Sequence, residues 1–489
     1  MRIELIGGSF LFVLIGSTFA ADQSRGVADA WQSLTRIDAE AAYELLENNH
    51  PAALPEVGDK EFTTALAAAH ARTLARAKTI TSYDGYLATL AEFANSMGDG
   101  HIASRSTFQR RYVKWAGIIA AKRGEDWVVG TDDPKIAGQE LAGARIVSCD
   151  GVPIQTRVQE VMPFHVSSGD IGFEVVRAGW ILIDDGNPFV TVPTACTFSR
   201  GGQETPVTLN WTEIALASLL NDKWKHPYGK AGFGVRAVGQ GYWIAIQELS
   251  PEAQAVIDAA RAQIDRIRKS AYVVIDFRGN SGGDDAYGRA LAEIIYGPNH
   301  VESVLGPKSD KGGCTPVYRA SDGNIEAIAK SAVQFRREGD TAGAKEYGDA
   351  VVAMKAARAR GQALTGPVTC SGKASTAAAS KGGSLMPAPV FLLTDALCFS
   401  SCISSSNFFR RLGAIQVGAT TGADTHFSEV RQSVLPSGLS TFSTLQAIET
   451  DSPAKMGPYE PKYPYSGDIA DTAALERWIS DTVLPEVGK

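Results

Sequence analysis

The chain has 489 residues, a net charge of −7 and a hydrophobic fraction of 44%. This length exceeds one ordinary core, so we expect about two to four domains of a globular protein. No block rich in lysine and arginine is present, which argues against nucleic-acid binding. The seven histidines are scattered and neither HExxH nor paired CxxC spacing occurs, so we expect no metal and no other cofactor.

The first 20 residues have the pattern of a secretory signal peptide. A basic second residue precedes an apolar run over residues 5–15, and small residues follow it. We expect cleavage after Ala20 or Ala21 and export to a periplasm or the exterior. An uncleaved anchor is the alternative, because Glu4 weakens the positive start. We expect no membrane span after signal removal, since no later stretch has roughly 20 apolar residues.

Cysteine usage fits an exported chain, in which disulfides form readily. Six cysteines allow 15 full pairings. Two pairs are suggested by position. Cys314 and Cys370 bracket one charged segment, and a bond between Cys398 and Cys402 would stiffen the turn that separates them. The remaining cysteines are Cys149 and Cys196.

After the signal, residues 21–112 are predicted to be helical. The runs 62–77 and 83–97 carry apolar residues at spacings of three and four. The second run ends in a Gly-Asp-Gly turn, residues 98–100. His101 follows this turn and can project into a cleft, whereas His70, inside a helical run, is expected to be a packing or surface residue.

Residues 113–215 have a β pattern of short apolar strands separated by turn residues. Residues 142–154 have the AG-x-x-I-x-x-x-DG-x-x-I shape of a PDZ domain. PDZ domains bind extended chain ends by adding a strand to a sheet edge. We therefore predict a PDZ-like domain at 113–215, with an ordinary β-hairpin as the alternative. A second hairpin is expected within 188–211.

The remaining chain is predicted to form an α/β core from residues 230–300 and 386–489. A strand, a helix and a strand follow one another over residues 241–275, an order that favours a sheet covered by helices. Residues 301–385 interrupt this core with a charged helical part and a stretch rich in Gly, Ser and Ala. This insertion either caps a cleft or is a decorated loop.

Two strand–turn–helix segments of the core carry residues suited to catalysis. The strand at 272–275 leads into a polar turn with Gly282 and Gly283, and the strand at 390–393 leads into serines that open a helix. Backbone N–H groups are free at such turns, and glycine lets the chain approach a ligand closely. A serine beside a turn of this kind suggests a nucleophile next to an oxyanion hole. The alternative is that Ser400 only caps the helix.

At these residues the chain resembles the tail-specific, or C-terminal processing, peptidases. Four features match in the right order: the PDZ-like insert, a D-x-R-x-N-x-GG turn at 276–283, the strand–serine–helix, and a VG-x-T-x-G strand end at 417–422. The resemblance implies the crotonase-like layered α/β core of that family, with an N-terminal helical region and the PDZ-like β insert.

The family has two catalytic types, and the sequence favours one of them. The Ser–Lys type needs a lysine just after the VG-x-T-x-G segment, but residues 423–428 contain none. The other type, similar to the tricorn core protease, uses Ser–His–Glu with the histidine in an N-terminal D-x-H segment. The resemblance then implies Ser400 as nucleophile, His101 as general base and Glu460 as the group that orients it.

The resemblance also implies an oxyanion hole formed by N–H groups of Gly282 or Gly283 and of Ser401. Ile403 stands where the family usually has a glutamate, which leaves Ser401 as an alternative nucleophile. His426 is a rival base or substrate contact. Cys402 is a weaker candidate for nucleophile, because exported cysteines tend to be oxidised.

These features together predict an exported serine endopeptidase that hydrolyses peptide bonds through an acyl-enzyme. Its substrate is a polypeptide, bound by its C-terminus if the PDZ-like groove is open. One alternative is a catalytically silent binding protein on the same fold, which has no need to keep the three catalytic residues. A crotonase-like acyl-CoA enzyme is a third possibility, which export of the chain disfavours.

Overall fold

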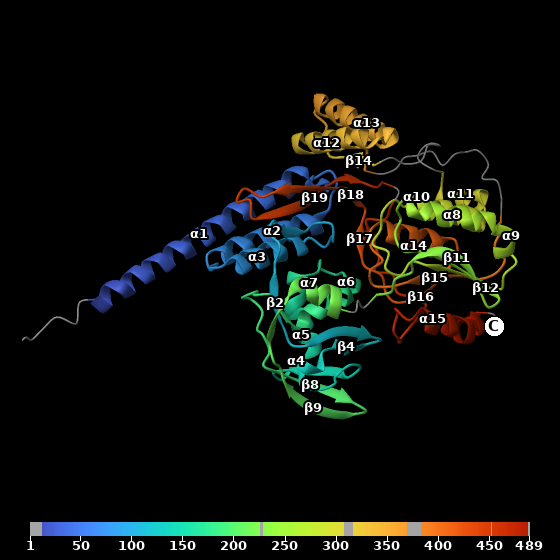
Figure 1. The fold of residues 1–489 in the computed structure, drawn as a ribbon. Coiled ribbons are helices and arrows are strands. Elements are labelled where there is room, and N and C mark those ends of the chain that lie inside the picture. Colours follow the sequence, from blue (N-terminus) through green and yellow to red (C-terminus); the bar gives the residue numbers. More distant parts are fainter. Residues whose placement is uncertain (1–11, 225–227, 308–315, 369–382, 451, 488–489) are drawn as a thin grey trace, which may run out of the picture.

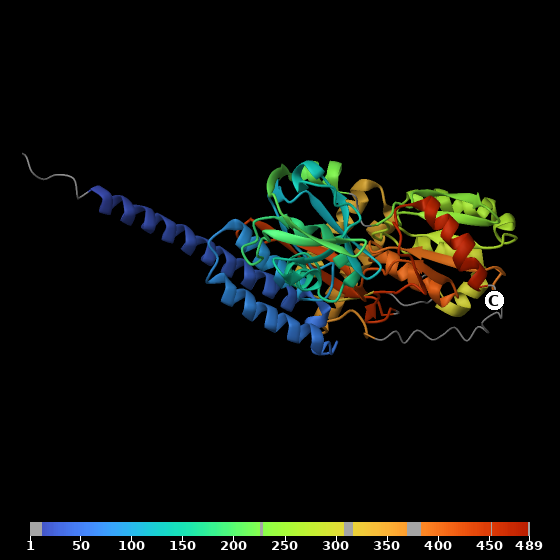
Figure 2. The same ribbon diagram turned by 90° about the horizontal axis from the view of Figure 1, so that it is seen from below.

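The computed structural model describes residues 12–224, 228–307, 316–368, 383–450 and 452–487, with side chains from residue 26 onward. Its N-terminal part is helical, with α1 (Phe12–Asn49), α2 (Lys60–Ala77) and α3 (Tyr83–Asn95). The Asp59 and Ser82 side chains accept backbone N–H bonds and so start α2 and α3. The first part of α1 extends away from the body of the molecule (Figure 1, Figure 2). Nowhere in the described residues is a helix both long and apolar enough to cross a bilayer.

A β-rich region follows and lies below the helices in Figure 1. One sheet has the order β3-β4-β5-β8-β9, with β6 beside β5, and a second has the order β10-β2-β7. Two hairpins fall where they were predicted, β5–β6 around an Asp150-Gly151 turn and β8–β9. The elements are β2 (Tyr112–Trp115), β3 (Ile118–Arg123), β4 (Asp126–Asp132), α4 (Pro134–Ala137), β5 (Arg145–Cys149), β6 (Val152–Pro153), α5 (Ile154–Val161), α6 (Ile171–Val176), β7 (Ile183–Asp184), β8 (Ala195–Arg200), β9 (Gln203–Thr208), β10 (Thr212–Ala215) and α7 (Leu216–Ser218).

The C-terminal half is built on a six-stranded sheet of order β11-β12-β13-β15-β16-β21. All neighbours are parallel except β11 and β12. Every residue of β13 and β15 is buried, as expected for parallel strands covered on both faces. The strands are β11 (Phe233–Val238), β12 (Gly241–Ile246), β13 (Val273–Asp276), β15 (Val390–Thr394), β16 (Ile415–Gly418) and β21 (Tyr463–Pro464).

Helices cover both faces of this sheet, so the mixed α/β architecture that the sequence predicted is present. One apolar core joins the sheet to α8, α10 and α14, and another joins its opposite face to α15 and the segment after it. In parallel sheets, ligands bind beyond the carboxyl ends of the strands. The turns after β13 and β15 lie at that edge. The helices are α8 (Glu252–Ala262), α9 (Ile264–Ile267), α10 (Ala286–Tyr296), α11 (Pro298–Leu305), α14 (Ser401–Arg411), α15 (Thr472–Trp478) and α16 (Leu484–Val487).

A further sheet joins the two ends of the chain. Its long strands are β18 (Phe427–Val434) and β19 (Ser440–Ile448), and β19 also pairs with β1 (Ser104–Ser106) and β14 (Val317–Tyr318). Phe93 of α3 packs against Phe442 of β19. This sheet brings the segment after α3 to the core. Nearby, β17 (Asp424–Thr425) pairs with β20 (Lys455–Met456).

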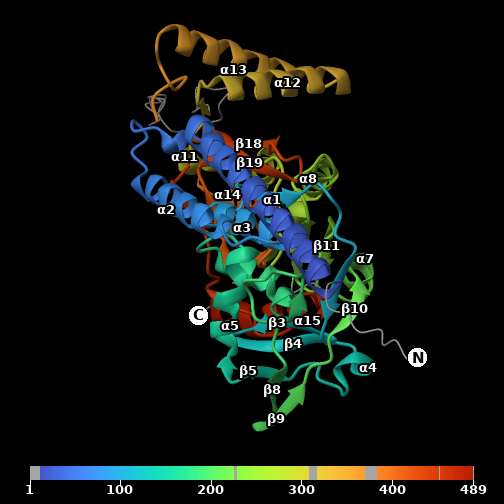
Figure 3. The same ribbon diagram turned by 90° about the vertical axis from the view of Figure 1, so that its left-hand side faces the viewer.

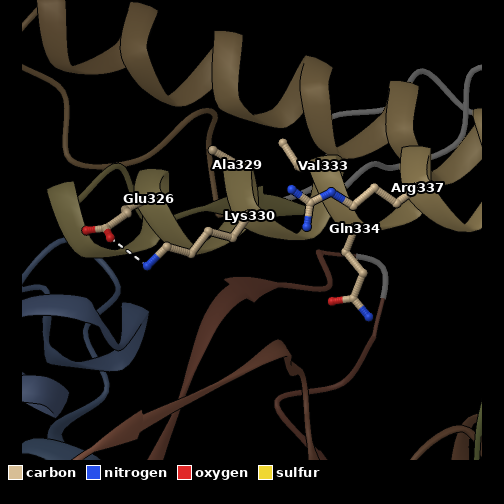
Figure 4. Close-up of a pocket in the computed structure, with 6 residues that line it drawn as sticks. All are labelled: Glu326, Ala329, Lys330, Val333, Gln334 and Arg337. Carbon is tan, nitrogen blue, oxygen red and sulfur yellow. Dashed lines mark ion pairs between the residues drawn. The ribbon is translucent and has the colours of Figure 1, made fainter.

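The predicted insertion contains a helical hairpin, α12 (Asp322–Glu338) and α13 (Thr341–Ala359), which projects from the body (Figure 3). It packs through Ile328 and Met354 against Tyr318 and Ala447 of the β19 sheet. A hollow of about 560 Å³ lies along one face of α12 (Figure 4). None of its described lining residues belongs to the two turns predicted to carry the chemistry.

The disulfides agree in part with expectation. Cys398 and Cys402 are bonded, as predicted, and both are fully buried. A second bond joins Cys149 of β5 to Cys196 of β8, a pair that the sequence did not single out. The predicted pair Cys314–Cys370 lies outside the described residues.

Candidate active site

Ser400 lies in the turn between β15 and α14 with backbone angles φ 55° and ψ −132°. A positive φ is unusual for a residue other than glycine and marks a strained turn. The Ser400 side chain makes no capping hydrogen bond to α14, so helix capping does not explain this residue. A side chain at Gly282 would place its Cβ 2.8 Å from the Ser400 Cβ. Glycine is therefore required where the two turns meet.

His101 stands opposite this serine, with its Nε2 3.1 Å from the Ser400 Oγ. Its segment is fixed by Ser443 of β19, whose hydroxyl donates to the His101 carbonyl at 2.6 Å and accepts from the Ala103 N–H at 2.8 Å. The ring of Phe399 lies 4.6 Å from the imidazole, centre to centre. The two residues, 299 positions apart in the sequence, thus form the hydrogen-bonded pair that a serine nucleophile needs.

The other imidazole nitrogen of His101 faces two carboxylates. Nδ1 lies 3.0 Å from Asp99 Oδ1 and 3.3 Å from Asp424 Oδ1. Asp99, 3% exposed, also accepts the His101 backbone N–H at 2.8 Å and the hydroxyl of Thr425. Asp424 is 7% exposed and accepts the Thr425 N–H at 2.7 Å. These contacts fix the ring and favour the tautomer with its proton on Nδ1 and its lone pair toward Ser400.

The electrostatics of the three groups follow from burial and hydrogen bonding. Burial works to lower the pKa of His101, but hydrogen bonds to Asp424 and Asp99 outweigh it and raise this pKa well above 6.5. Burial works to raise the pKa of Asp99, yet its bonds from His101 and Thr425 hold it below the usual value. Burial raises the pKa of Asp424. Asp99 is therefore the firmer counter-ion of the imidazolium.

Asp99, His101 and Asp424 also form the one group of possible metal ligands in the described residues, with donor atoms within 4.8 Å of one another. In this structure Nδ1 of His101 lies within hydrogen-bonding distance of both carboxylates, and its Nε2 lies 3.1 Å from the Ser400 Oγ.

Glu460, predicted to orient the histidine, is exposed. Its neighbour Tyr459 accepts the Thr421 backbone N–H at 3.1 Å and donates its own N–H to the Thr421 hydroxyl at 2.9 Å. Within the described residues, no hydrogen bond or ion pair joins Glu460 to His101. The structure instead brings Asp99 and Asp424 to the Nδ1 atom of His101. Asp99 belongs to the D-x-H segment that predicted His101. Asp424 lies in residues 423–428, where the Ser–Lys type would have its lysine. Both carboxylates therefore lie in segments that the family resemblance had already singled out.

The N–H groups predicted to form the oxyanion hole differ in whether they already have a hydrogen-bond acceptor. The Gly282 N–H donates to the Asn280 side chain at 2.9 Å and is occupied. In the described part of the chain, neither the Gly283 N–H nor the Ser401 N–H has an acceptor. A Cβ built on Gly282 would lie 3.1 Å from the Ser401 nitrogen, which shows how closely the two turns approach. Gly283 and Ser401 are the available pair.

The residues predicted as alternatives to Ser400 and His101 are engaged in other contacts. The Ser401 hydroxyl donates to the Gly283 carbonyl at 2.6 Å, so it is engaged away from His101. His426 packs edge-on against Phe427 at 4.5 Å, and no described hydrogen bond connects it to Ser400. Cys402 is in a disulfide.

Comparison with known proteins gives a structural likeness only. No protein-family model and no curated protein matches the chain. Among solved structures, mature CPAF complexed with lactacystin aligns over 94% of this chain and 98% of its own, with a TM-score of 0.59 and 14% identity. Mature CPAF alone aligns over 94% and 99%, with a TM-score of 0.60 and 12% identity. The chain therefore shares this fold over nearly its whole length.

Proposed function

We propose that the protein is an exported serine endopeptidase of the tail-specific peptidase family, with Ser400 as nucleophile and His101 as general base. The observation that carries this proposal is the 3.1 Å contact between Ser400 Oγ and His101 Nε2, made by a strained serine beside two open backbone N–H groups. The fold shared with CPAF and the family motifs point the same way. The disulfides and the signal-like N-terminus support export.

In the proposed reaction, the Ser400 hydroxyl oxygen attacks the peptide carbonyl carbon while His101 Nε2 takes its proton. The N–H groups of Gly283 and Ser401 stabilise the oxyanion that develops. The C–N bond then breaks, His101 protonates the leaving amine, and the acyl-enzyme forms. Water, activated by the same imidazole, attacks the ester and releases the acid and Ser400.

We assign the orientation of the imidazole to Asp99, assisted by Asp424, because both lie against Nδ1. The role predicted for Glu460 stays a prediction, and comparing Asp99→Asn with Glu460→Gln tests it. The variant that loses more kcat identifies the orienting group. We expect that to be Asp99→Asn, because the amide would favour the wrong tautomer.

Active-site labelling of the full chain with a fluorophosphonate tests the proposal. We expect label on Ser400, found by peptide mapping, together with cleavage of casein. Ser400→Ala and His101→Ala should lose both, whereas the neighbouring variants Ser401→Ala and His426→Ala should keep the label on Ser400. Label on Ser401 would move the nucleophile by one residue. Absence of label and of cleavage would favour a silent binding protein on this fold.

A further inference from the structure

Asp170 is a buried acidic residue of the β-rich region that the proposed mechanism does not use. It directly precedes α6, is 3% exposed, and accepts the Phe173 N–H on its Oδ1 at 2.9 Å. This bond caps the helix and occupies one of the two carboxylate oxygens. An asparagine or a serine would cap the helix equally well without the cost of burying a charge, so capping alone does not explain an aspartate here.

The second carboxylate oxygen faces the loop that leads to Asp424. A Cβ built on Gly422 would lie 3.5 Å from Asp170 Oδ2. The Ala423 N–H interacts with the same carboxylate and favours its ionised form. Ala423 is the residue before Asp424, whose Oδ1 lies 3.3 Å from Nδ1 of His101. The Asp170 carboxylate thus joins the start of α6 to the neighbour of an imidazole partner.

The same loop is enclosed between α6 and the turn that carries the nucleophile. A Cβ on Gly172 of α6 would overlap the Thr421 carbonyl group, so the two backbones touch there. On the other side, the Gly422 N–H donates to the Cys398 carbonyl at 3.0 Å. Glycine is needed at both contact points because backbone approaches backbone. In this close-packed junction Asp170 supplies a charged acceptor, whose hydrogen bonds are stronger than those between neutral groups.

Asp170 is ionised at mildly alkaline pH although it is buried. Burial, aided by the charge of Asp424, raises the pKa of Asp170 to about 6, although the N–H groups of Phe173 and Ala423 oppose this. At pH 8 the carboxylate therefore carries its charge, and both of its oxygens can accept hydrogen bonds.

We propose that Asp170 is a positioning residue of the active site, whose carboxylate holds residues 421–423 so that Asp424 reaches His101. This inference rests on the proposed peptidase function for its effect on catalysis. Asp170 acts through Asp424 and the imidazole rather than on the substrate. Because a displacement of about 1 Å in a catalytic group can cost about 100-fold in rate, losing this contact should lower kcat and leave substrate binding intact.

The substitution Asp170→Asn separates the two roles of the side chain. Asparagine can keep the Phe173 bond, but its NH2 group then faces the Ala423 N–H, and two donors cannot bond each other. We expect kcat for fluorescein-labelled casein at pH 8 to fall about 10-fold with KM unchanged. In the Asp424→Asn background the same substitution should lower kcat by less than about 2-fold, since no Asp424 carboxylate is left to position. Asp133→Asn, which changes the matched cap of α4 in the same region, should alter neither constant.

Crystal structures of the wild type and of Asp170→Asn make the test independent of catalysis. We expect α6 to be unchanged and the Asp424 carboxylate to lie beyond the hydrogen-bond limit of about 3.5 Å from Nδ1 of His101. Gly422→Ala is a second variant that disturbs the junction from the loop side, because its Cβ would lie 3.2 Å from the Cys398 carbonyl oxygen and from Phe173 Cδ2. It should displace Asp424 and lower kcat in the same way.

The outcomes distinguish this inference from the proposed function. Displacement of Asp424 in a chain whose wild type neither cleaves casein nor takes the fluorophosphonate would support the contact and refute the peptidase. An Asp424 that stays in place in both variants would overturn the positioning role, whether or not the wild type is active. An unchanged kcat in an active enzyme, or a fall that is just as large in the Asp424→Asn background, would overturn it too.

Discussion

The Nδ1 atom of His101 lies 3.0 Å from one carboxylate, Asp99, and 3.3 Å from another, Asp424. Asp99 accepts three hydrogen bonds, from the imidazole, the His101 backbone N–H and the Thr425 hydroxyl. Asp424 has fewer partners and its pKa is raised by burial. The two residues should therefore affect catalysis differently, Asp99 through orientation and Asp424 mainly through charge.

The pH dependence of kcat and kcat/KM distinguishes the roles of Asp99 and Asp424. His101 must be neutral to accept the serine proton, so kcat/KM should rise with pH as the imidazole loses its proton, between 6.5 and about 10. Asp424→Asn removes a hydrogen bond that raises the pKa of His101, so we expect the acid limb of the kcat/KM profile to move to lower pH. Asp99→Asn should lower kcat about 100-fold or more over the whole range. Peptide hydrolysis from pH 5 to 10 measures both.

The exposed Asp258→Asn serves as the control and should leave the profile unchanged. Acid limbs at the same pH in the wild type and in Asp424→Asn would contradict the assignment. At this scale the sequence predicted the serine and the histidine from local motifs. It did not predict that Asp99 and Asp424 meet, because 325 positions separate them and only the folded chain joins their segments.

At the scale of elements, the pairing of β1 with β19 determines where His101 lies. Ser104 is opposite Phe442 in this antiparallel pair, and Ser443 fixes the histidine segment. Strand β1 has three residues and lies in a stretch predicted to be helical, so no periodicity could identify it. The long helices and the buried parallel strands were predictable because each carries its own pattern of apolar residues.

The two disulfides hold elements of different kinds, and their removal should have different effects. Cys149–Cys196 closes a loop of 47 residues, and Cys398–Cys402 one of 4. Chain entropy predicts a loss of about 4 kcal/mol for the first and about 2 kcal/mol for the second when both cysteines become serine. The second bond, however, brackets Ser400, so its loss should lower kcat while the first leaves kcat of the folded protein unchanged.

Urea unfolding gives the free energies, and the fluorophosphonate labelling rate reports the state of Ser400. Equal labelling rates in the two double variants, both measured well below their unfolding midpoints, would show that the Cys398–Cys402 bond does not position the nucleophile.

At the scale of the molecule, the β-rich region directly contacts the turn that carries Ser400 and the loop before Asp424. A Cβ built on Gly172 of α6 would lie 2.3 Å from the Thr421 carbonyl oxygen, so the two backbones are in close contact. Phe173, the next residue, packs against Phe399. The region thus supports both the turn that carries Ser400 and the loop that leads to Asp424.

Asp395 connects three distant segments at the end of β15. This fully buried carboxylate accepts the N–H groups of Gly229 at 2.8 Å, Gly279 at 2.9 Å and Leu397 at 3.1 Å. They belong to the segment that enters the core, to the glycine turn and to the turn of Ser400. Burial raises the pKa of Asp395 to about 7, despite these three donors.

A pKa of about 7 in the folded chain, against about 3.9 in the unfolded chain, makes stability depend on pH. Between these values the folded state holds a proton that the unfolded state has lost, so the contribution of Asp395 to the free energy of unfolding falls as pH rises from about 4 to about 7.

We expect the free energy of unfolding of the wild type, minus that of Asp395→Asn, to fall by up to about 1.4 kcal/mol per pH unit in this window. Taking the difference cancels the pH dependence of the other groups, and the constant cost of replacing the carboxyl group by an amide does not affect its slope. Urea unfolding at pH 4.5 to 7.5 measures it, with the exposed Asp258→Asn as the control variant. A constant difference would mean that Asp395 is ionised throughout, held by its three N–H donors more firmly than burial opposes them.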